Sequence, residues 1–154
     1  MKKVQLKTIF EFLEEKEEHN MPFKLKLIFN EPLTEEELNV KSDLDLFDSK
    51  ITSLPKGLKI RGYLDLRKTN ITSLPDGLEV GGNLFLNKTD ITSLPEDLKV
   101  GGSLELSYSK TTSLPKGLEV GRNLYIDDSP LIKYSDKQLR EMVEPGFING
   151  EIFR

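Results

Sequence analysis

Apolar residues recur along the middle of the chain with a period of 20 residues and no insertion. Segments 51–70, 71–90, 91–110 and 111–130 are nearly the same sequence, and 31–50 is a degenerate fifth copy that lacks the Leu-Pro pair. A fixed period of this length is the signature of a protein built from stacked repeats. The pattern therefore predicts a solenoid.

The apolar positions that the copies share predict the inside of each coil. Leu84 and Leu86 are two residues apart, so they lie on one face of a strand. Pro75 disfavours a helix across its junction, and Gly81 and Gly82 are predicted to bend the chain before the strand. Twenty residues are too few for a strand, a full helix and two turns, so we expect an extended or tightly turned outer arc. The inward positions of this copy are Ile71, Leu74, Leu78, Val80, Leu84 and Leu86.

Stacking these coils predicts a parallel β-ladder. Its strands would lie about 4.8 Å apart, so five coils would span roughly 24 Å. The leucines that begin the predicted strands are Leu44, Leu64, Leu84, Leu104 and Leu124.

Both flanks of the repeats are predicted to be caps, because a solenoid must cover its open ends. At the N-terminus, Thr8 and Glu11 form a capping box for a helix over 8–18, which Pro22 ends. The alternating residues 23–27 then predict a strand, and Thr34 with Glu37 predicts a short helical turn at 35–38.

The C-terminal flank predicts a helix and a hairpin. Ser135 and Gln138 form a capping box, and Pro145-Gly146 ends the helix that follows. Residues 147–153 contain an Asn-Gly pair between apolar residues, which is typical of a hairpin. We thus divide a single domain into an N-terminal cap at 1–30, repeats at 31–130 and a C-terminal cap at 131–154. Either flank could also contact a partner.

The repeat motif Leu64-x-Leu66-x-x-Thr69-x-Ile71-x-x-Leu74-Pro75-x-x-Leu78 resembles the leucine-rich repeat. It is similar to the shortest class, of about 20 residues, found in bacterial effector and phage-encoded proteins, and covers about two thirds of the chain. The resemblance implies an α/β-type repeat solenoid with a parallel β-ladder of about five coils. The chain departs from the family where hydroxyls replace the usual Asn, which satisfies backbone groups of the adjacent coil. A hydroxyl can do part of this, so we expect a slightly different loop. These hydroxyl residues are Ser49, Thr69, Thr89, Ser109 and Ser129.

The amino-acid composition limits the class of molecule that the protein could bind and the cellular compartment in which it is expected. The net charge of −4 argues against a nucleic-acid-binding surface, which is normally basic. The absence of cysteine excludes disulfides and thiolate metal sites and fits a reducing compartment. The N-terminal stretch has no uninterrupted apolar core of the length that a signal peptide needs, so we expect none, and no run of the sequence approaches about 18 apolar residues. We expect a soluble, cytoplasmic protein without membrane contact, in the host cytoplasm if a phage or pathogen encodes it.

Candidate chemistry is sparse. His19 is the single histidine, and no signature places a nucleophile beside it. Asp43, Asp45 and Asp48 are the one acid cluster with spacing worth testing, but they lack the sharp Gly turn of a calcium loop. The glycines before each strand lack the Lys-Ser/Thr tail of a phosphate loop. We predict no catalytic residues, no metal and no cofactor.

The outward strand positions differ between copies while the inward ones do not, as a binding face requires. Exposed aromatic side chains beside polar ones are typical anchors of protein interfaces, although Phe85 or Tyr125 could instead pack within its own column. The predicted partner-binding residues are Tyr63, Asp65, Arg67, Asn83, Phe85, Asn87, Glu105, Tyr108 and Tyr125.

These observations predict a non-catalytic scaffold that recognises a partner protein. The alternatives are an inhibitor that covers the working surface of a host enzyme, a metal-dependent enzyme that uses the acidic strand, and a module that self-associates through its ladder edge. Adjacent charge bands could orient a charged partner: 31–50 has seven acidic and two basic residues, and 51–70 has five basic and one acidic. The oligomeric state stays open.

Overall fold

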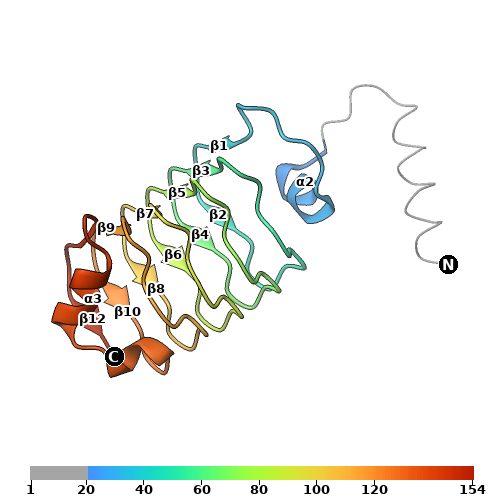
Figure 1. Ribbon diagram of the computed structural model, residues 1–154. Helices are drawn as coiled ribbons and strands as arrows, with labels where there is room; N and C mark the ends of the chain where they lie inside the picture. The colour runs from blue at the N-terminus through green and yellow to red at the C-terminus, as the bar shows by residue number, and fades with distance from the viewer. Residues whose placement is uncertain (1–20) are drawn as a thin grey trace, which may run out of the picture.

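The computed structural model describes residues 21–154 and shows a parallel β-solenoid of coils of about 20 residues (Figure 1). Each coil contributes two short strands, one to each of two six-stranded parallel ladders. The odd ladder consists of β1 (Asn39–Val40), β3 (Lys59–Ile60), β5 (Glu79–Val80), β7 (Lys99–Val100), β9 (Glu119–Val120) and β11 (Phe147–Ile148). The even ladder consists of β2 (Leu44–Asp45), β4 (Leu64–Asp65), β6 (Leu84–Phe85), β8 (Leu104–Glu105), β10 (Leu124–Tyr125) and β12 (Ile152–Phe153).

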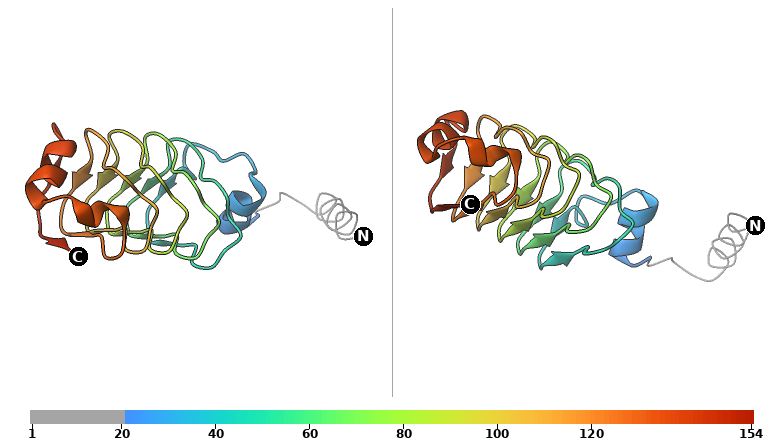
Figure 2. Two further views of the ribbon diagram at one scale, coloured as in Figure 1. Left: turned by 60° about the horizontal axis from the view of Figure 1, so that its bottom comes forward. Right: turned by 90° about the horizontal axis from the view of Figure 1, so that it is seen from below.

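The even ladder is the parallel β-ladder that the sequence analysis predicted. Leu64 pairs in parallel with Leu44 on one side and with Leu84 on the other, and this register continues to Leu104 and Leu124. The odd ladder lies on a second side of each coil (Figure 2) and has no counterpart in the prediction. Its strands are two residues long, like those of the even ladder. Leu78 and Val80 have the same two-residue spacing as Leu84 and Leu86, but the prediction used this spacing only for the even ladder.

The glycines between the two ladders lie in the predicted bend, and they also bring neighbouring coils close together. Neither Gly81 nor Gly82 has a left-handed backbone. A Cβ on Gly81 would lie 2.4 Å from the Arg61 carbonyl oxygen, and one on Gly82 would lie 2.8 Å from the Gly62 carbonyl carbon. These glycines therefore let neighbouring coils approach closely. The left-handed glycines lie on the outer arc, as at Gly77 with φ 74°.

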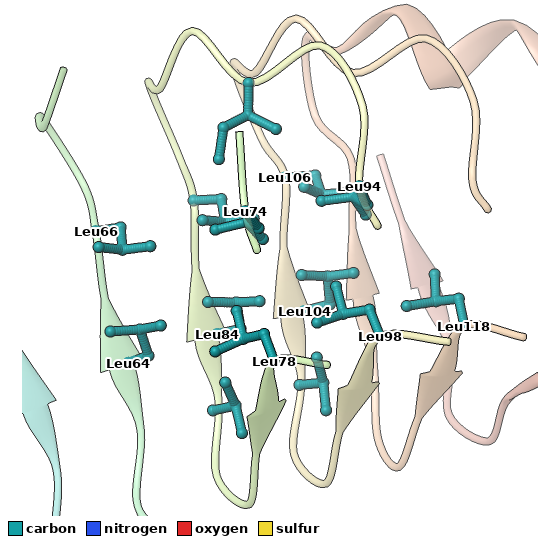
Figure 3. Packing of buried hydrophobic residues seen from close by; sticks show 14 of the residues in the cluster. Leu64, Leu66, Leu74, Leu78, Leu84, Leu94, Leu98, Leu104, Leu106 and Leu118 are labelled. Atoms are coloured by element: carbon teal, nitrogen blue, oxygen red, sulfur yellow. The ribbon is translucent and has the colours of Figure 1, made fainter. Parts of the chain in front are cut away.

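Leucine columns fill the space inside the coils (Figure 3). Leu64, Leu84, Leu104 and Leu124 are each 0 % exposed, and the outer-arc column containing Leu74 and Leu94 packs from the opposite side. Each such side chain contributes about 1.5–3 kcal/mol relative to an exposed one. The predicted core is confirmed.

Four residues of the predicted hydroxyl column are buried, whereas Ser49 is partly buried and its hydroxyl has no hydrogen-bond partner among the described residues. The Thr69 hydroxyl donates to the Leu66 carbonyl oxygen at 2.7 Å, and Thr89 and Ser129 make the same bond three residues back. No helix follows this turn in the repeats, so the outer arc is extended with tight turns, as expected.

The N-terminal prediction is partly wrong. Residues 23–27 belong to helix α2 (Phe23–Phe29) and not to a strand. Phe23 and Leu27 are four residues apart, which is helical spacing, and leucine and lysine are good helix formers. The Thr34–Glu37 capping box is confirmed, with hydrogen bonds of 2.9 and 3.2 Å. The predicted helix over 8–18 lies outside the described residues.

At the C-terminus, a 3₁₀ helix η1 (Pro130–Lys133) precedes α3 (Asp136–Met142), and the predicted Ser135–Gln138 capping box is present. The predicted hairpin is wrong. β11 and β12 do not pair with each other: β11 pairs in parallel with β9, and β12 with β10. Asn149-Gly150-Glu151 therefore turns the corner between the two ladders, as in every earlier coil. Across residues 21–154, no helix has the length and apolar character needed to cross a membrane.

Candidate functional site

The predicted binding residues lie on the outer side of the even ladder or in the loop directly after it. We call this surface the even face. It comprises the outward residues of the even-ladder strands, the residue before each strand, and the outward residues of the loop up to three positions after it. All nine predicted residues belong to it: Tyr63, Asp65, Arg67, Asn83, Phe85, Asn87, Glu105, Tyr108 and Tyr125.

One end of the even face carries a compact group that we call the Arg67 cluster: Phe47, Tyr63, Asp65, Arg67 and Phe85. The Arg67 guanidinium carbon lies 5.4 Å from the Phe47 ring centroid and 5.2 Å from that of Phe85. The Tyr63 and Phe85 rings meet edge to face at 6.1 Å. Three consecutive coils thus supply one aromatic cluster around Arg67, and the Lys68 ammonium also lies 5.2 Å from the Phe47 ring centroid.

Asp65 fixes the position of Arg67. Its carboxylate accepts from the Arg67 Nε at 2.9 and 3.0 Å and from the Nη2 at 2.5 Å. This hydrogen bonding raises the pKa of the Arg67 guanidinium above its already high ordinary value. Asp65 is only 4 % exposed, so it positions Arg67 and offers little surface of its own.

The other end of the even face carries a second aromatic pair, Tyr125 and Phe153. Their rings stack with centroids 4.9 Å apart and planes inclined by 13°. The pair forms because β12 adds to the ladder beside β10 and places Phe153 opposite Tyr125. The Asn123 amide donates to the Tyr125 hydroxyl at 3.4 Å.

A polar stripe separates the two aromatic groups. The Ser107 hydroxyl lies 2.5 Å from a Glu105 carboxylate oxygen and 3.1 Å from one of Asp127, and it can donate to only one of them at a time. Asn87 is half-buried, and its side-chain oxygen is buried without a hydrogen-bond partner among the described residues.

The column that begins each even strand also has a structural task. The Asn83 side-chain oxygen accepts from the Ser103 backbone N–H at 2.8 Å, and Asn123 accepts in the same way from Glu151 at 3.0 Å. Asp43 accepts from the Tyr63 N–H at 2.9 Å. These side chains bridge neighbouring coils, so Asn83 holds the stack as well as lying on the face.

Tyr108 is the most exposed aromatic residue of the described chain, at 54 %. It sits in the loop after β8 with φ 58°, and the Lys88 ammonium lies 5.5 Å from its ring centroid. A hydrogen bond to the Asp128 carboxylate raises the pKa of the Tyr108 phenol. Its ring therefore lies between a cation and an anion at the border of the even face.

The acidic residues singled out in the sequence serve the backbone. Asp43 accepts from Tyr63, as above, and Asp45 accepts from the Phe47 N–H at 2.9 Å. Within residues 21–154, no group of three or more acidic, histidine or cysteine side chains is arranged to hold a metal ion. His19 lies outside the described residues. The even face therefore offers aromatic, cationic and amide groups, which suit binding.

The prediction missed two residues of the face, Phe47 and Phe153. Phe47 occupies the same column as Arg67 and Asn87, so its register was visible. Phe153 was assigned to a hairpin. The segment 147–153, FINGEIF, matches 119–125, EVGRNLY, in its apolar spacing, and this similarity could have revealed a sixth coil.

The chain matches no known family model, no curated protein and no solved structure.

Proposed function

We propose that this protein is a non-catalytic scaffold that binds a partner protein through the even face. The Arg67 cluster carries the proposal. Aromatic residues and arginine dominate the energetic centres of protein interfaces, and here two rings flank one arginine on a rigid ladder.

The cluster is ordered before any partner arrives. Asp65 holds Arg67 through Nε and Nη2, which leaves Nη1 without a partner among the described residues. A side chain held in its bound geometry loses little conformational entropy on binding. The free Nη1 can donate to a carbonyl or carboxylate oxygen, while Phe47 and Phe85 contact the apolar surroundings of that oxygen.

Tyr125 and Phe153 supply a second contact area. The Arg67 cluster ends on β6 and the pair begins on β10, two strand spacings further, or about 10 Å at about 4.8 Å per strand. A partner covering both would span most of the ladder, with Glu105 between the two areas as a polar contact. Such a surface combines apolar anchors with a polar surround.

We also propose that the coils are short leucine-rich repeats, as the sequence motif suggests. The buried columns of Leu64, Leu66, Ile71 and Leu74 support it. A partner that is a host enzyme would make the protein an inhibitor, and an activity assay of the captured partner with increasing amounts of this protein distinguishes the two cases.

The experiment compares three forms of the full chain as bait in extracts of its native host: the wild type, Phe85→Ala with Tyr125→Ala, and the control Lys116→Ala. Lys116 is exposed on the outer arc. A protein captured by the wild type and the control is purified, and its affinity is measured by calorimetry. Each anchor is expected to contribute about 2 kcal/mol or more, so the double variant should lose about 4 kcal/mol or more and bind at least about 700-fold more weakly.

Circular dichroism and thermal melting show whether the variants remain folded. If Lys116→Ala weakens binding while the folded double variant binds like the wild type, the partner uses the outer arc and the proposal is wrong.

A further inference from the structure

The outward residues of the odd ladder form two rows, which together we call the odd face. The first row is Asn39, Lys59, Glu79, Lys99, Glu119 and Phe147. The second row, two residues later in each coil, is Lys41, Arg61, Gly81, Gly101, Gly121 and Asn149. Unlike the even face, the first row alternates strictly in charge along its four middle coils.

Neighbouring coils already use this alternation. Lys59 pairs with Glu79 at 3.0 Å, and Lys99 pairs with Glu119 at 3.9 Å. All four side chains keep between 39 % and 54 % of their surface exposed, so each can accept a further opposite charge. The order Lys-Glu-Lys-Glu has a second property. When a second copy of this row is laid over the first in the opposite direction, every lysine faces a glutamate.

We infer that the odd face binds a second copy of this chain in an antiparallel, two-fold symmetric pair. The axis runs along the strand direction between β5 and β7, so the coil order of one copy is reversed over the other. Lys59 then faces Glu119 of the second copy, and Glu79 faces Lys99 of the second copy. Each contact occurs twice, as a two-fold interface requires.

The shape of the odd face fits the same arrangement. Gly81, Gly101 and Gly121 carry no side chain, so the second row is low where the two copies cross, and Gly81 lies opposite Gly101 of the second copy. An open hollow runs along the odd face from β1 to β7, and Asn39 and Lys41 line its outer end. At the other end, Phe147 is 42 % exposed.

Reversal places Phe147 of each copy over Asn39 of the other, at the β1 end of the hollow. The ring can stack there on the neighbouring Lys41 ammonium, which is a favourable cation–π contact. Lys41 and Arg61 make the face basic at this end, and Glu119 of the second copy lies closest to Arg61. The two-fold axis thus exchanges the basic end of the odd face with the end that carries the exposed aromatic ring.

The other face-to-face arrangement is unfavourable. In that arrangement the two-fold axis would run along the direction in which the coils stack. Each coil would then lie over the same coil of the second copy, and the first row of one copy would face the second row of the other. Lys59 would then face Arg61 of the second copy, and no glutamate would face a lysine. Like charges in contact disfavour that arrangement, so charge selects the antiparallel one.

The odd face is a narrow strip, so the pair should be weak and sensitive to salt. Surfaces smaller than a standard interface give transient complexes, and exposed charges are screened within about 10 Å at 0.1 M salt. We expect a monomer–dimer equilibrium at protein concentrations of about 0.1–1 mM in low salt, with less dimer at about 0.5 M salt.

Two charge-swapped variants of the full chain separate pairing between copies from pairing within one chain. Lys59→Glu with Glu79→Lys keeps an opposite charge within both intrachain pairs but sets like charges against each other between copies. Glu79→Lys with Lys99→Glu does the reverse: it sets like charges together within each chain and keeps every contact between copies complementary.

Sedimentation equilibrium at low salt measures the dimer, and thermal melting measures the fold. The first variant sets like charges side by side within the chain only at positions 79 and 99, so we expect it to lose less thermal stability than the second. Its dimer dissociation constant should rise at least about 10-fold. The second should melt lower yet dimerise like the wild type, and Phe147→Ala should weaken the dimer of the otherwise unchanged chain. A wild type that stays monomeric to about 1 mM, or a dimer that survives the first swap or is lost in the second, overturns the inference.

Discussion

The even and odd faces rest on one leucine core but carry different chemistry. On the odd face, the four charged side chains of the first row form two ion pairs between neighbouring coils, and their order stays complementary when one copy is reversed over another. On the even face, the aromatic groups differ at the two ends, and no symmetry relates the Arg67 cluster to Tyr125 and Phe153. A repeating, self-complementary surface suits a second copy, whereas an asymmetric one suits a different partner.

The difference also shows how a short repeat divides its positions. The inward columns must match because stacked leucines fill one continuous core. Outward positions are constrained only by neighbours one coil away, about 4.8 Å distant. Charge pairing satisfies that constraint on the odd face, and ring contacts together with the Asp65–Arg67 pair satisfy it on the even face.

The largest expected effect comes from the core that both faces share. Leu84→Ala should lower the free energy of unfolding by about 2–5 kcal/mol, because it leaves a cavity at a fully buried position. Urea unfolding measures the loss, and hydrogen exchange should show faster exchange in both ladders. A loss below about 0.5 kcal/mol, the range of surface changes, would mean that the faces do not depend on this column.

A change confined to the odd ladder should have the next largest effect. Gly101→Ala places a Cβ 2.4 Å from the Gly81 carbonyl oxygen, so the coils must separate. We expect a loss of about 1–3 kcal/mol in urea unfolding, as for other overpacked positions. Lys99→Ala, on the same face, is the control and should change stability by less than about 0.5 kcal/mol. Equal losses for the two variants would refute the close approach of the coils.

Double-mutant cycles can sharpen the contrast between the ion pairs of the two faces. Asp65 and Arg67 should show a coupling energy of about 1.5 kcal/mol or more, because the Asp65 side chain is only 6 % exposed and its bonds to Arg67 are charge-assisted. Lys59 and Glu79 are about half exposed, so their coupling should be about 0.2–1 kcal/mol and should fall with added salt. Similar couplings with similar salt dependence would remove this distinction between the faces.

The smallest expected effect concerns the border of the even face. The Asp128 carboxylate accepts a hydrogen bond from the neutral Tyr108 phenol and repels its phenolate, which raises the phenol pKa. The stability this gives is complete below the ordinary tyrosine pKa of about 10 and is lost as the pH rises through the higher folded value. Asp128→Asn should therefore lower the Tyr108 pKa, as followed by NMR of the ring. An unchanged titration would show that the hydrogen bond does not form in solution.

Several features of the even face were visible in the sequence. The 20-residue period placed Tyr63, Arg67, Phe85 and Tyr125 in outward columns, and all of them lie there. The burial of Asp65 was not visible, because it depends on Arg67 folding back over its own strand. The role of Asn83 between coils was hidden for a similar reason, since its hydrogen-bond partner is 20 residues away.

By itself, the sequence determined the coil length, the inward columns, the even ladder and two capping boxes. Each of these depends on residue spacing or on side chains a few positions apart, and such signals are local. Only the tertiary structure decided that the segments at β1 to β11 pair into a second ladder, that 147–153 continues both ladders, and that 23–29 is a helix. β12 pairs with residues 28 positions earlier, which departs from the 20-residue period. Hydrogen bonds and packing between coils, which no local pattern encodes, fix these elements.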